Sequence, residues 1–144
     1  MGFVGGSIGD KLMGELSNDI ATSKSARVIV PVCHIYLEHM LDLLLMKKFS
    51  HAKKFLRNTN NGFYEKVNKL KKLKILSDDE YHDLSLINNI RNKFVHNFKP
   101  DLKLISTKIL RLRLHKFNKK RNPVEVILYD IIQLMSLLDQ KLAN

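Results

Sequence analysis

The sequence predicts an all-α protein, a bundle of four to five helices, and three observations support this fold class. Apolar residues recur every three to four positions in the long segments, as in helices with one buried face. Two segments begin with helix-capping signals, at Ser77 and at Asn122. The connections are short, as is usual in bundles. The chain has 144 residues and no internal Gly/Pro/Ser-rich linker. We therefore expect a flexible leader at residues 1–9 and a single helical domain at 10–144.

The strongest core element is predicted at residues 22–49, after a short helix at 8–18. Thr22 or Ser23 is expected to cap its start, because their side chains accept hydrogen bonds from the first backbone amides. Pro31 is expected either to kink this helix or to lie in its first turn. The inward residues recur at helical spacing: Val28, Val32, Ile35, Leu37, Met40, Leu41, Leu44 and Leu45.

A second helix is predicted at residues 63–73, after a basic stretch at 47–57 and a loop at 58–62. The run Asn-Thr-Asn-Asn-Gly in that loop is typical of turns. The helix is expected to bury Phe63, Val67, Leu70 and Leu73, and to carry Lys66, Lys69, Lys71 and Lys72 on its outer side.

Two further helices are predicted from their end signals. Ser77 followed by Glu80 forms a capping box that opens a helix to about residue 98, which Pro100 ends. Residues 101–117 are ambiguous, and we expect a short helix followed by an extended arm. A last helix starts after Asn122, and its inward residues are Val126, Ile127, Tyr129, Ile131, Leu134, Leu137 and Leu138.

The charge and the composition favour a cytoplasmic protein that binds a polyanion. Lysine and arginine number 25 against 14 acidic residues, so the formal net charge is +11, and nucleic acid is the first candidate partner. Cys33 is the single cysteine, which forms no internal disulfide and has apolar neighbours, so we expect it to be buried. No signal sequence is visible, and the apolar stretch at 28–46 contains four ionisable residues, which argues against a membrane span. No metal-ligand spacing and no glycine loop for a phosphate are visible, so no cofactor is expected.

The candidate site lies in the helix after Ser77, where Arg91 falls within an apolar stripe. On a helical projection, Arg91 lies among Leu84, Ile87, Phe94 and Phe98. A guanidinium in that position is costly unless it lines a cavity or finds a partner. The alternatives are an arginine at the edge of the stripe, or an ion pair with a carboxylate such as Glu38 or Asp42.

The second component of the candidate site is His96, which lies about 140° around a regular helix from Arg91. Either fraying of the helix before Pro100 or a second subunit is needed to bring the two side chains to one phosphate. The imidazolium form is favoured at the C-terminal end of a helix. The spacing of Arg91 and His96 alone is not specific, because short Arg–His intervals arise from composition.

These residue types suit cleavage of RNA without a metal ion. RNA carries its own nucleophile, the 2′-hydroxyl, so cleavage needs a base, an acid and a cation. Histidine acts as base or acid near neutral pH, and the planar guanidinium of an arginine such as Arg91 binds phosphate. Asn92 is suited to orient the phosphate or the imidazole of His96.

Longer stretches of sequence resemble a known family. Residues 62–70, 75–84 and 87–96, with 25–41 before them, resemble the mannitol operon repressor-like family over about residues 10–140. That family is similar to a branch of the HEPN superfamily, many of whose members are metal-independent endoribonucleases in toxin–antitoxin, antiviral and RNA-processing systems. Their motif is an arginine, a polar residue, a short gap and a histidine, which Arg91, Asn92 and His96 match. The resemblance implies a HEPN-like helical bundle and a homodimer in which the motif helices meet.

Two departures from the family pattern are visible. Toxin-type HEPN proteins often have a tyrosine two residues after the histidine, and this chain has Phe98 there. A nucleotidyltransferase that silences such toxins on the tyrosine would have no target here. The mannitol repressor-like proteins are named as transcription regulators, but no helix-turn-helix signature is visible in this chain. A regulatory role would therefore depend on partner proteins or on RNA.

Three functions remain open from the sequence. The first is an endoribonuclease, as a toxin or defence effector, with an antitoxin as a possible protein partner. The second is a non-catalytic regulator of transcription that acts as a dimeric interaction module. The third is an RNA-binding module without chemistry, for which few aromatic residues among the basic ones indicate no platform for stacking bases. The candidate nucleic-acid-binding residues are Lys66, Lys69, Lys72, Lys93, Arg111, Arg113, Lys119, Lys120 and Arg121.

Overall fold

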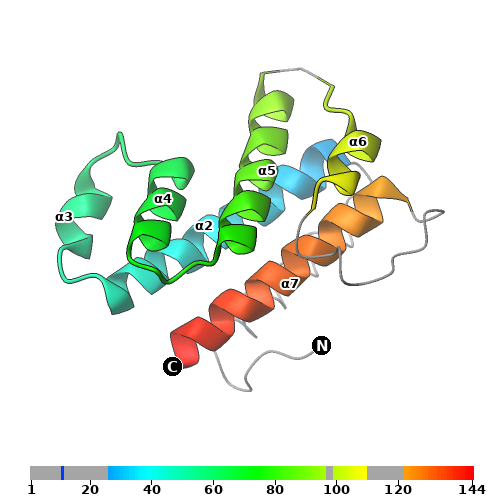
Figure 1. Cartoon of the computed structure of the whole chain (residues 1–144). Helices are drawn as coiled ribbons and strands as arrows, with labels where there is room; N and C mark the ends of the chain where they lie inside the picture. Colours follow the sequence, from blue (N-terminus) through cyan, green and yellow to red (C-terminus); the bar gives the residue numbers. More distant parts are fainter. Residues whose placement is uncertain (1–10, 12–25, 97–98, 110–121) are drawn as a thin grey trace.

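The structure is a computed structural model that describes Lys11 and residues 26–96, 99–109 and 122–144. Within these segments all regular structure is helical and no strand is present, so the all-α prediction is confirmed. The described part holds more helices than the four to five expected, because the basic stretch before the loop at 58–62 also forms a short helix. The helices, labelled in Figure 1, are α2 (Ala26–Lys48), α3 (Ala52–Arg57), α4 (Phe63–Lys72), α5 (Asp78–Val95), α6 (Leu102–Thr107) and α7 (Pro123–Ala143).

The core lies between α2 and α7, which run side by side in the same direction (Figure 1). At their C-terminal ends the ammonium group of Lys47 donates a hydrogen bond to the carbonyl of Leu142. Fully buried side chains from both helices fill the space between them and under α5, and burial of each contributes roughly 1.5–3 kcal/mol. They include Leu37, Leu41, Leu44, Ile131, Leu134 and Leu138.

The predicted inward face of α2 is correct in its C-terminal part and wrong at two positions. Val28 is 49% exposed and Ile35 is 66% exposed. The two residues are seven apart and therefore share one side of the helix, whereas Leu37 lies about 200° from Ile35 and is buried. Pro31 lies inside the helix rather than in its first described turn. The expected caps at residues 22 and 23, and the helix expected at 8–18 apart from Lys11, lie outside the described residues.

Helices α4 and α5 form an antiparallel pair that packs on α2 (Figure 1). The predicted bounds of α4 are nearly right, but Leu73 caps its C-terminus and is 38% exposed instead of buried. The capping box that opens α5 is confirmed. The Oγ of Ser77 accepts from the amide of Glu80 at 3.2 Å, and Oε1 of Glu80 accepts from the amide of Ser77 at 2.9 Å. α5 ends at Val95, earlier than predicted, and residues 97–98 lie outside the described part.

The last two helices both begin with a side-chain cap. Asp101 caps α6 through a hydrogen bond of 3.0 Å from the amide of Leu104, so the predicted short helix after residue 100 is present. The arm expected to follow it falls on residues 110–121, outside the described part. Asn122 caps α7 through a 2.9 Å bond from the amide of Val124, and Pro123 occupies the first turn as predicted.

Among the described helices, one is long and apolar enough to cross a membrane by length and composition alone. It runs from Arg27 to Lys48, 22 residues with a mean hydropathy of 1.6 in the most apolar window. Half of that window is buried inside the fold. Core helices of soluble proteins and signal sequences meet the same criterion, so this composition does not by itself indicate a membrane span.

Candidate functional site

Arg91 and Asn92 form a hydrogen-bonded unit near the C-terminal end of α5. The Nη1 of Arg91 donates to Oδ1 of Asn92 at 3.1 Å, and both side chains are partly buried. Leu84, Ile87 and Ile90 of the same helix are buried in the core. Arg91 therefore lies at the edge of the apolar stripe of α5, and its side chain is partly exposed.

The carboxylates that the sequence offered as partners for Arg91 are engaged by Lys66 of α4. Its Nζ lies 2.8 Å from Oδ1 of Asp42 and 3.6 Å from Oε2 of Glu38, both on α2. Among the described residues no carboxylate forms an ion pair with Arg91. Lys66, predicted on the outer side of its helix, is only 11% exposed and joins α4 to α2. Its charge is therefore less available to a phosphate than those of its neighbours on α4.

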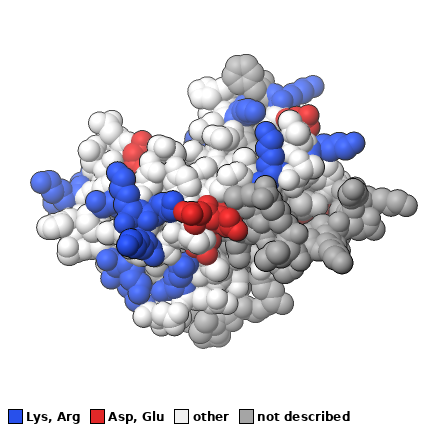
Figure 2. Space-filling view, viewed as in Figure 1, with Lys and Arg blue, Asp and Glu red and all other residues white. Residues whose placement is uncertain are grey.

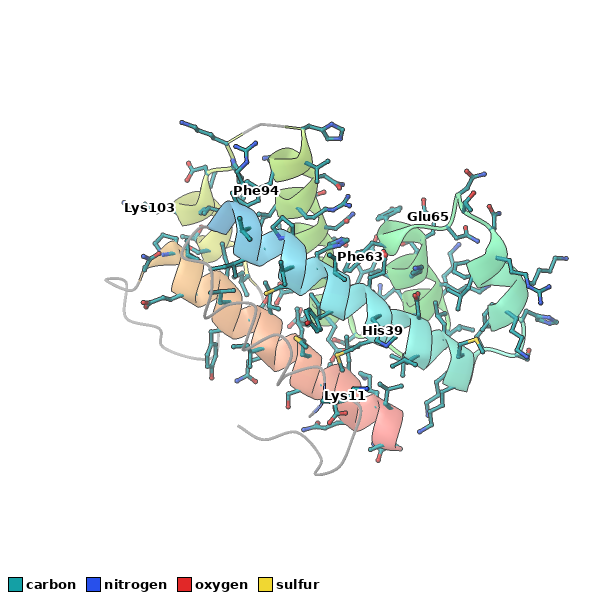
Figure 3. All side chains as sticks on the ribbon, turned by 180° about the vertical axis from the view of Figure 1, so that it is seen from behind. Lys11, His39, Phe63, Glu65, Phe94 and Lys103 are labelled. Carbon is teal, nitrogen blue, oxygen red and sulfur yellow. The ribbon has the colours of Figure 1, made fainter. Side chains whose placement is uncertain are left out.

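A buried histidine that the sequence analysis did not single out lies close to this cluster. His34 on α2 is buried, its Nε2 lies 3.0 Å from Oδ1 of Asn88 on α5, and its ring stacks on Phe63 at 4.1 Å. Figure 3 shows Phe63 at the junction of α2 and α4. Burial lowers the pKa of His34, and the positive charges of Arg91 and Lys66 lower it further against the opposing effects of Asn88 and Glu38. The imidazole is therefore neutral at physiological pH.

His96 occupies the C-cap of α5, away from the buried cluster. Its amide donates to the carbonyl of Asn92 at 3.0 Å, and its side chain is exposed. α5 remains helical through Val95. Fraying before Pro100, one of the two ways considered for bringing His96 to Arg91, is therefore absent up to Val95, and a regular helix places residue 96 about 140° around from residue 91. The structure joins Arg91 to Asn92 by a hydrogen bond, and no direct hydrogen bond joins the side chain of His96 to either of them within the described residues.

The other candidate nucleic-acid-binding residues divide into two groups. Lys69 and Lys72 lie on α4 and Lys93 lies on α5, and all three reach the surface in part or in full. Figure 2 shows lysine and arginine side chains gathered over α3 and α4 on this face of the molecule. The remaining candidates lie outside the described residues: Arg111, Arg113, Lys119, Lys120 and Arg121.

Other reactive groups in the described part are structural. Cys33 is fully buried, as predicted, and burial raises the pKa of its thiol to about 12, so the thiolate form is not available as a nucleophile. Within residues 26–96, 99–109 and 122–144, no cluster of three His, Cys, Asp or Glu side chains is arranged to hold a metal ion. The chemistry of the candidate site is thus that of arginine, amide and imidazole groups.

Comparison of the chain with protein-family models, with curated proteins and with solved structures gives no match. The assignment of a function therefore depends on the residues of the site and on the resemblance described above.

Proposed function

We propose that this protein is a metal-independent endoribonuclease of the HEPN type that acts as a homodimer. The observation that supports this best is the Arg91–Asn92 unit. A guanidinium held by a neutral amide keeps its full positive charge for an anionic ligand, whereas an arginine neutralised by a carboxylate does not. The nearby carboxylates, Glu38 and Asp42, already form ion pairs with Lys66.

The reaction uses the 2′-hydroxyl of RNA as the nucleophile. The 2′-oxygen forms a bond to phosphorus while the bond from phosphorus to the 5′-oxygen breaks, which leaves a 2′,3′-cyclic phosphate and a 5′-hydroxyl. A base removes the 2′ proton and an acid protonates the leaving 5′-oxygen, and His96 supplies one of these functions. Arg91 stabilises the negative charge on the phosphorane oxygens. Asn92 orients the Arg91 guanidinium through their hydrogen bond.

The proposal requires two copies of the chain. On a regular helix, residue 96, the C-cap of α5, lies about 140° around from residue 91, so one copy would offer only half of the site to a phosphate. A two-fold dimer in which the α5 ends meet would place His96 of one subunit near Arg91 of the other. Such a protein would act in the cytoplasm, as a toxin or defence effector, with an antitoxin as its natural protein partner.

The test is cleavage of total RNA and transfer RNA by the purified protein in the presence of a chelator. We expect fragments that end in a 2′,3′-cyclic phosphate from the wild type, and none from the His96→Ala variant at equal folding. His39→Ala is the matched control, because His39 is also an exposed histidine but lies on α2. Cleavage that survives His96→Ala would refute the proposal.

Mixing two inactive variants tests the shared site. Arg91→Ala and His96→Ala subunits should each be inactive alone, and together they should recover part of the activity if one site takes its arginine and its histidine from different subunits. If the wild type cleaves RNA but the mixture of the two variants recovers no activity, both residues act within one subunit and the dimeric site is excluded.

A second candidate function is a dimeric regulator of transcription without catalysis. Two features favour it: the separation of residues 91 and 96 around a regular helix, and exposed apolar residues on one side of α2 that are suited to a protein partner. These residues are Val28, Ile35 and Met46. This function predicts no RNA cleavage by the wild type, and an Arg91→Ala variant with weaker dimerisation in sedimentation experiments. A dimer of unchanged affinity in Arg91→Ala would count against it.

A further inference from the structure

Two phenylalanines meet at the surface around α3, where the sequence offered no base-stacking platform. Phe49 follows α2, Phe55 belongs to α3, and their rings are 6.2 Å apart between centroids in an edge-to-face arrangement. His51 lies edge-on to Phe49 at 5.8 Å. Both phenylalanines are only partly buried. They are six residues apart in the sequence, and the turn at residues 49–51 together with the short helix α3 places them together.

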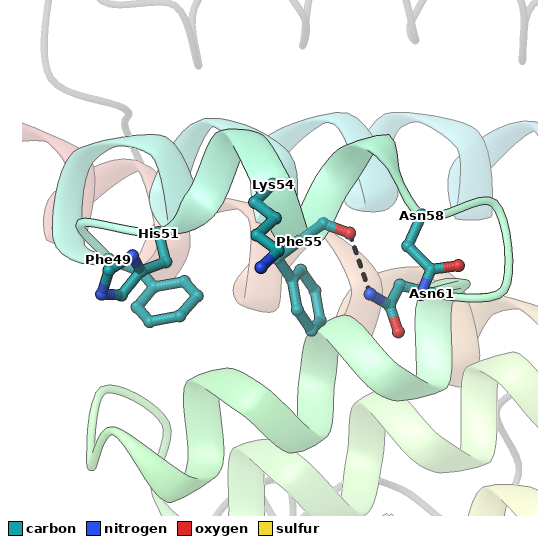
Figure 4. Close-up of a pocket in the computed structure, with 6 residues that line it drawn as sticks. All are labelled: Phe49, His51, Lys54, Phe55, Asn58 and Asn61. Atoms are coloured by element: carbon teal, nitrogen blue, oxygen red, sulfur yellow. Dashed lines mark hydrogen bonds between the residues drawn. The ribbon is translucent and has the colours of Figure 1, made fainter.

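These rings line hollows on the surface. One hollow of about 330 Å³ is lined by Phe49, His51, Lys54, Phe55, Asn58 and Asn61 (Figure 4). A second hollow, of about 250 Å³, lies beyond Phe55 and Asn61, and α4 forms its other wall. A volume of 300 Å³ or slightly more is at the small end of the range for ligand sites. The hollow therefore suits one flat ring rather than a large ligand.

The rim of the hollows is basic. The Nζ of Lys69 lies 4.5 Å from the centroid of the Phe49 ring, which fixes one cation beside the aromatic pair. A third hollow, of about 530 Å³, lies beside Phe49. Among the described residues that line the three hollows, Glu65 is the single acid, and its carboxylate accepts a hydrogen bond from the amide of Gly62 at 2.9 Å. The lysines that line the hollows around α3 are Lys47, Lys48, Lys53, Lys54, Lys69 and Lys72. Such a rim attracts a ligand with repeated negative charges.

The rim also offers neutral hydrogen-bonding groups. Asn61 donates from Nδ2 to the carbonyl of Phe55 at 2.8 Å, which fixes its side chain at the edge of the hollow (Figure 4). Oδ1 of Asn58 accepts from the amide of Asn60 at 3.0 Å. Within the described part of the chain, the Nδ2 of Asn58 and the Oδ1 of Asn61 form no further hydrogen bond, so one donor and one acceptor remain for a ligand.

We propose that this surface, formed by Phe49, Phe55 and the surrounding lysines, binds single-stranded RNA through an unpaired base. The base stacks on the ring of Phe55 inside the hollow of about 330 Å³, and the flanking phosphates bind Lys54 and Lys72. Aromatic side chains in a basic groove are the usual means of holding single strands, because every base has a stackable face. The inference rests on the proposed ribonuclease function and specifies its substrate as RNA with unpaired bases.

The experiment measures binding and cleavage separately. Binding is measured with the full chain carrying His96→Ala, by fluorescence anisotropy with a labelled twelve-nucleotide oligouridine and with an RNA duplex of equal length. Phe55→Leu keeps an apolar side chain and removes the ring. We expect it to weaken oligouridine binding about tenfold and to leave duplex binding unchanged. The folded fraction of each variant is checked by circular dichroism.

A matched pair of charge reversals controls for general electrostatics. Lys54→Glu and Lys103→Glu change the net charge equally, but Lys103 lies on α6, at the opposite end of the molecule from α3 (Figure 3). Only Lys54→Glu should weaken oligouridine binding by more than tenfold and reduce the slope of log affinity against log salt by about 0.7 per lost phosphate contact. Lys54 is exposed, so this variant should fold even if Phe55→Leu does not.

The possible results separate the two proposals. Binding that depends on Phe55 and Lys54, in a protein that never cleaves RNA, supports this surface and refutes the nuclease. Cleavage with no effect of Phe55→Leu or Lys54→Glu on affinity supports the nuclease and overturns this surface. The proposed surface is also overturned if Lys54→Glu and Lys103→Glu lose oligouridine affinity equally, or if the protein binds an acidic peptide more tightly than oligouridine.

Discussion

His34 on α2 and Asn88 on α5, one turn of helix before Arg91, form a hydrogen bond of 3.0 Å that is partly buried between the two helices. This bond ties the helix that carries the candidate site to the central helix of the fold. Because the pKa of His34 is lowered by burial, the neutral imidazole is the form that the folded protein accommodates.

The first prediction concerns the pH dependence of stability. The folded pKa of His34 lies below its ordinary value of 6.5, so the unfolded chain binds the proton more readily. The stability that comes from the neutral His34 is fully present above pH 6.5, and it is lost as the pH falls from 6.5 through the folded pKa. Urea denaturation from pH 8 to pH 5 should show this loss in the wild type and a smaller loss in His34→Gln. The same profile in both proteins would contradict the prediction, and His39→Gln is the control.

The second prediction concerns the start of α5. Ser77→Ala removes the side-chain oxygen that accepts from the amide of Glu80, and should lower the free energy of unfolding by about 1 kcal/mol. Chemical denaturation measures the change. Ser50→Ala is the control, because Ser50 is an exposed serine after α2. If Ser77→Ala and Ser50→Ala lower the free energy of unfolding by similar small amounts, the cap contributes little to stability.

The third prediction concerns the ion pairs between α4 and α2. Lys66→Met leaves Glu38 and Asp42 without their cation and should destabilise the protein by about 1–2 kcal/mol, between the values for exposed and for buried pairs. Lys72→Met, on the same helix but exposed, should have almost no effect. A double-mutant cycle with Asp42→Asn should show a coupling of at least about 0.5 kcal/mol. Additive losses would mean that the contact is not energetically significant.

The fourth prediction compares two apolar residues of α2. Leu41 is fully buried, so Leu41→Ala should cost about 2–5 kcal/mol through the lost contacts and the cavity. Ile35 is mostly exposed, and Ile35→Ala should change the free energy of unfolding by less than about 0.5 kcal/mol. Denaturation at low protein concentration measures both. If both variants lost comparable amounts of unfolding free energy, Ile35 would belong to the core, which would contradict the structure.

The fifth prediction concerns Cys33. Since the thiol is buried and its pKa is raised to about 12, the native protein should not react with a thiol reagent at pH 8. In denaturant it should react with one equivalent. Rapid reaction of the native protein would show that α2 opens, or that the thiol is accessible.

The elements with strong local signals were predicted from the sequence. The capping box of Ser77 and Glu80, and the Asn122–Pro123 start of α7, are local hydrogen-bonding patterns, and the structure contains both. The buried leucines in the second half of α2 follow from periodicity in the same way. Periodicity alone does not show which edge of the wide apolar stripe of α2 is covered by other helices, so the prediction that Val28 and Ile35 are buried is wrong.

The sequence by itself determined the all-α class, the ends of several helices and the candidate residues Arg91, Asn92 and His96, because these depend on neighbours close in the chain. The tertiary structure decided which partners those residues meet. In the fold, Glu38 and Asp42 form ion pairs with Lys66 and not with Arg91. His34 is buried and hydrogen-bonds with Asn88, and the rings of Phe49 and Phe55 contact each other among lysines. Such contacts join residues on different helices or across a turn, and their geometry depends on how the helices pack, which no local pattern specifies.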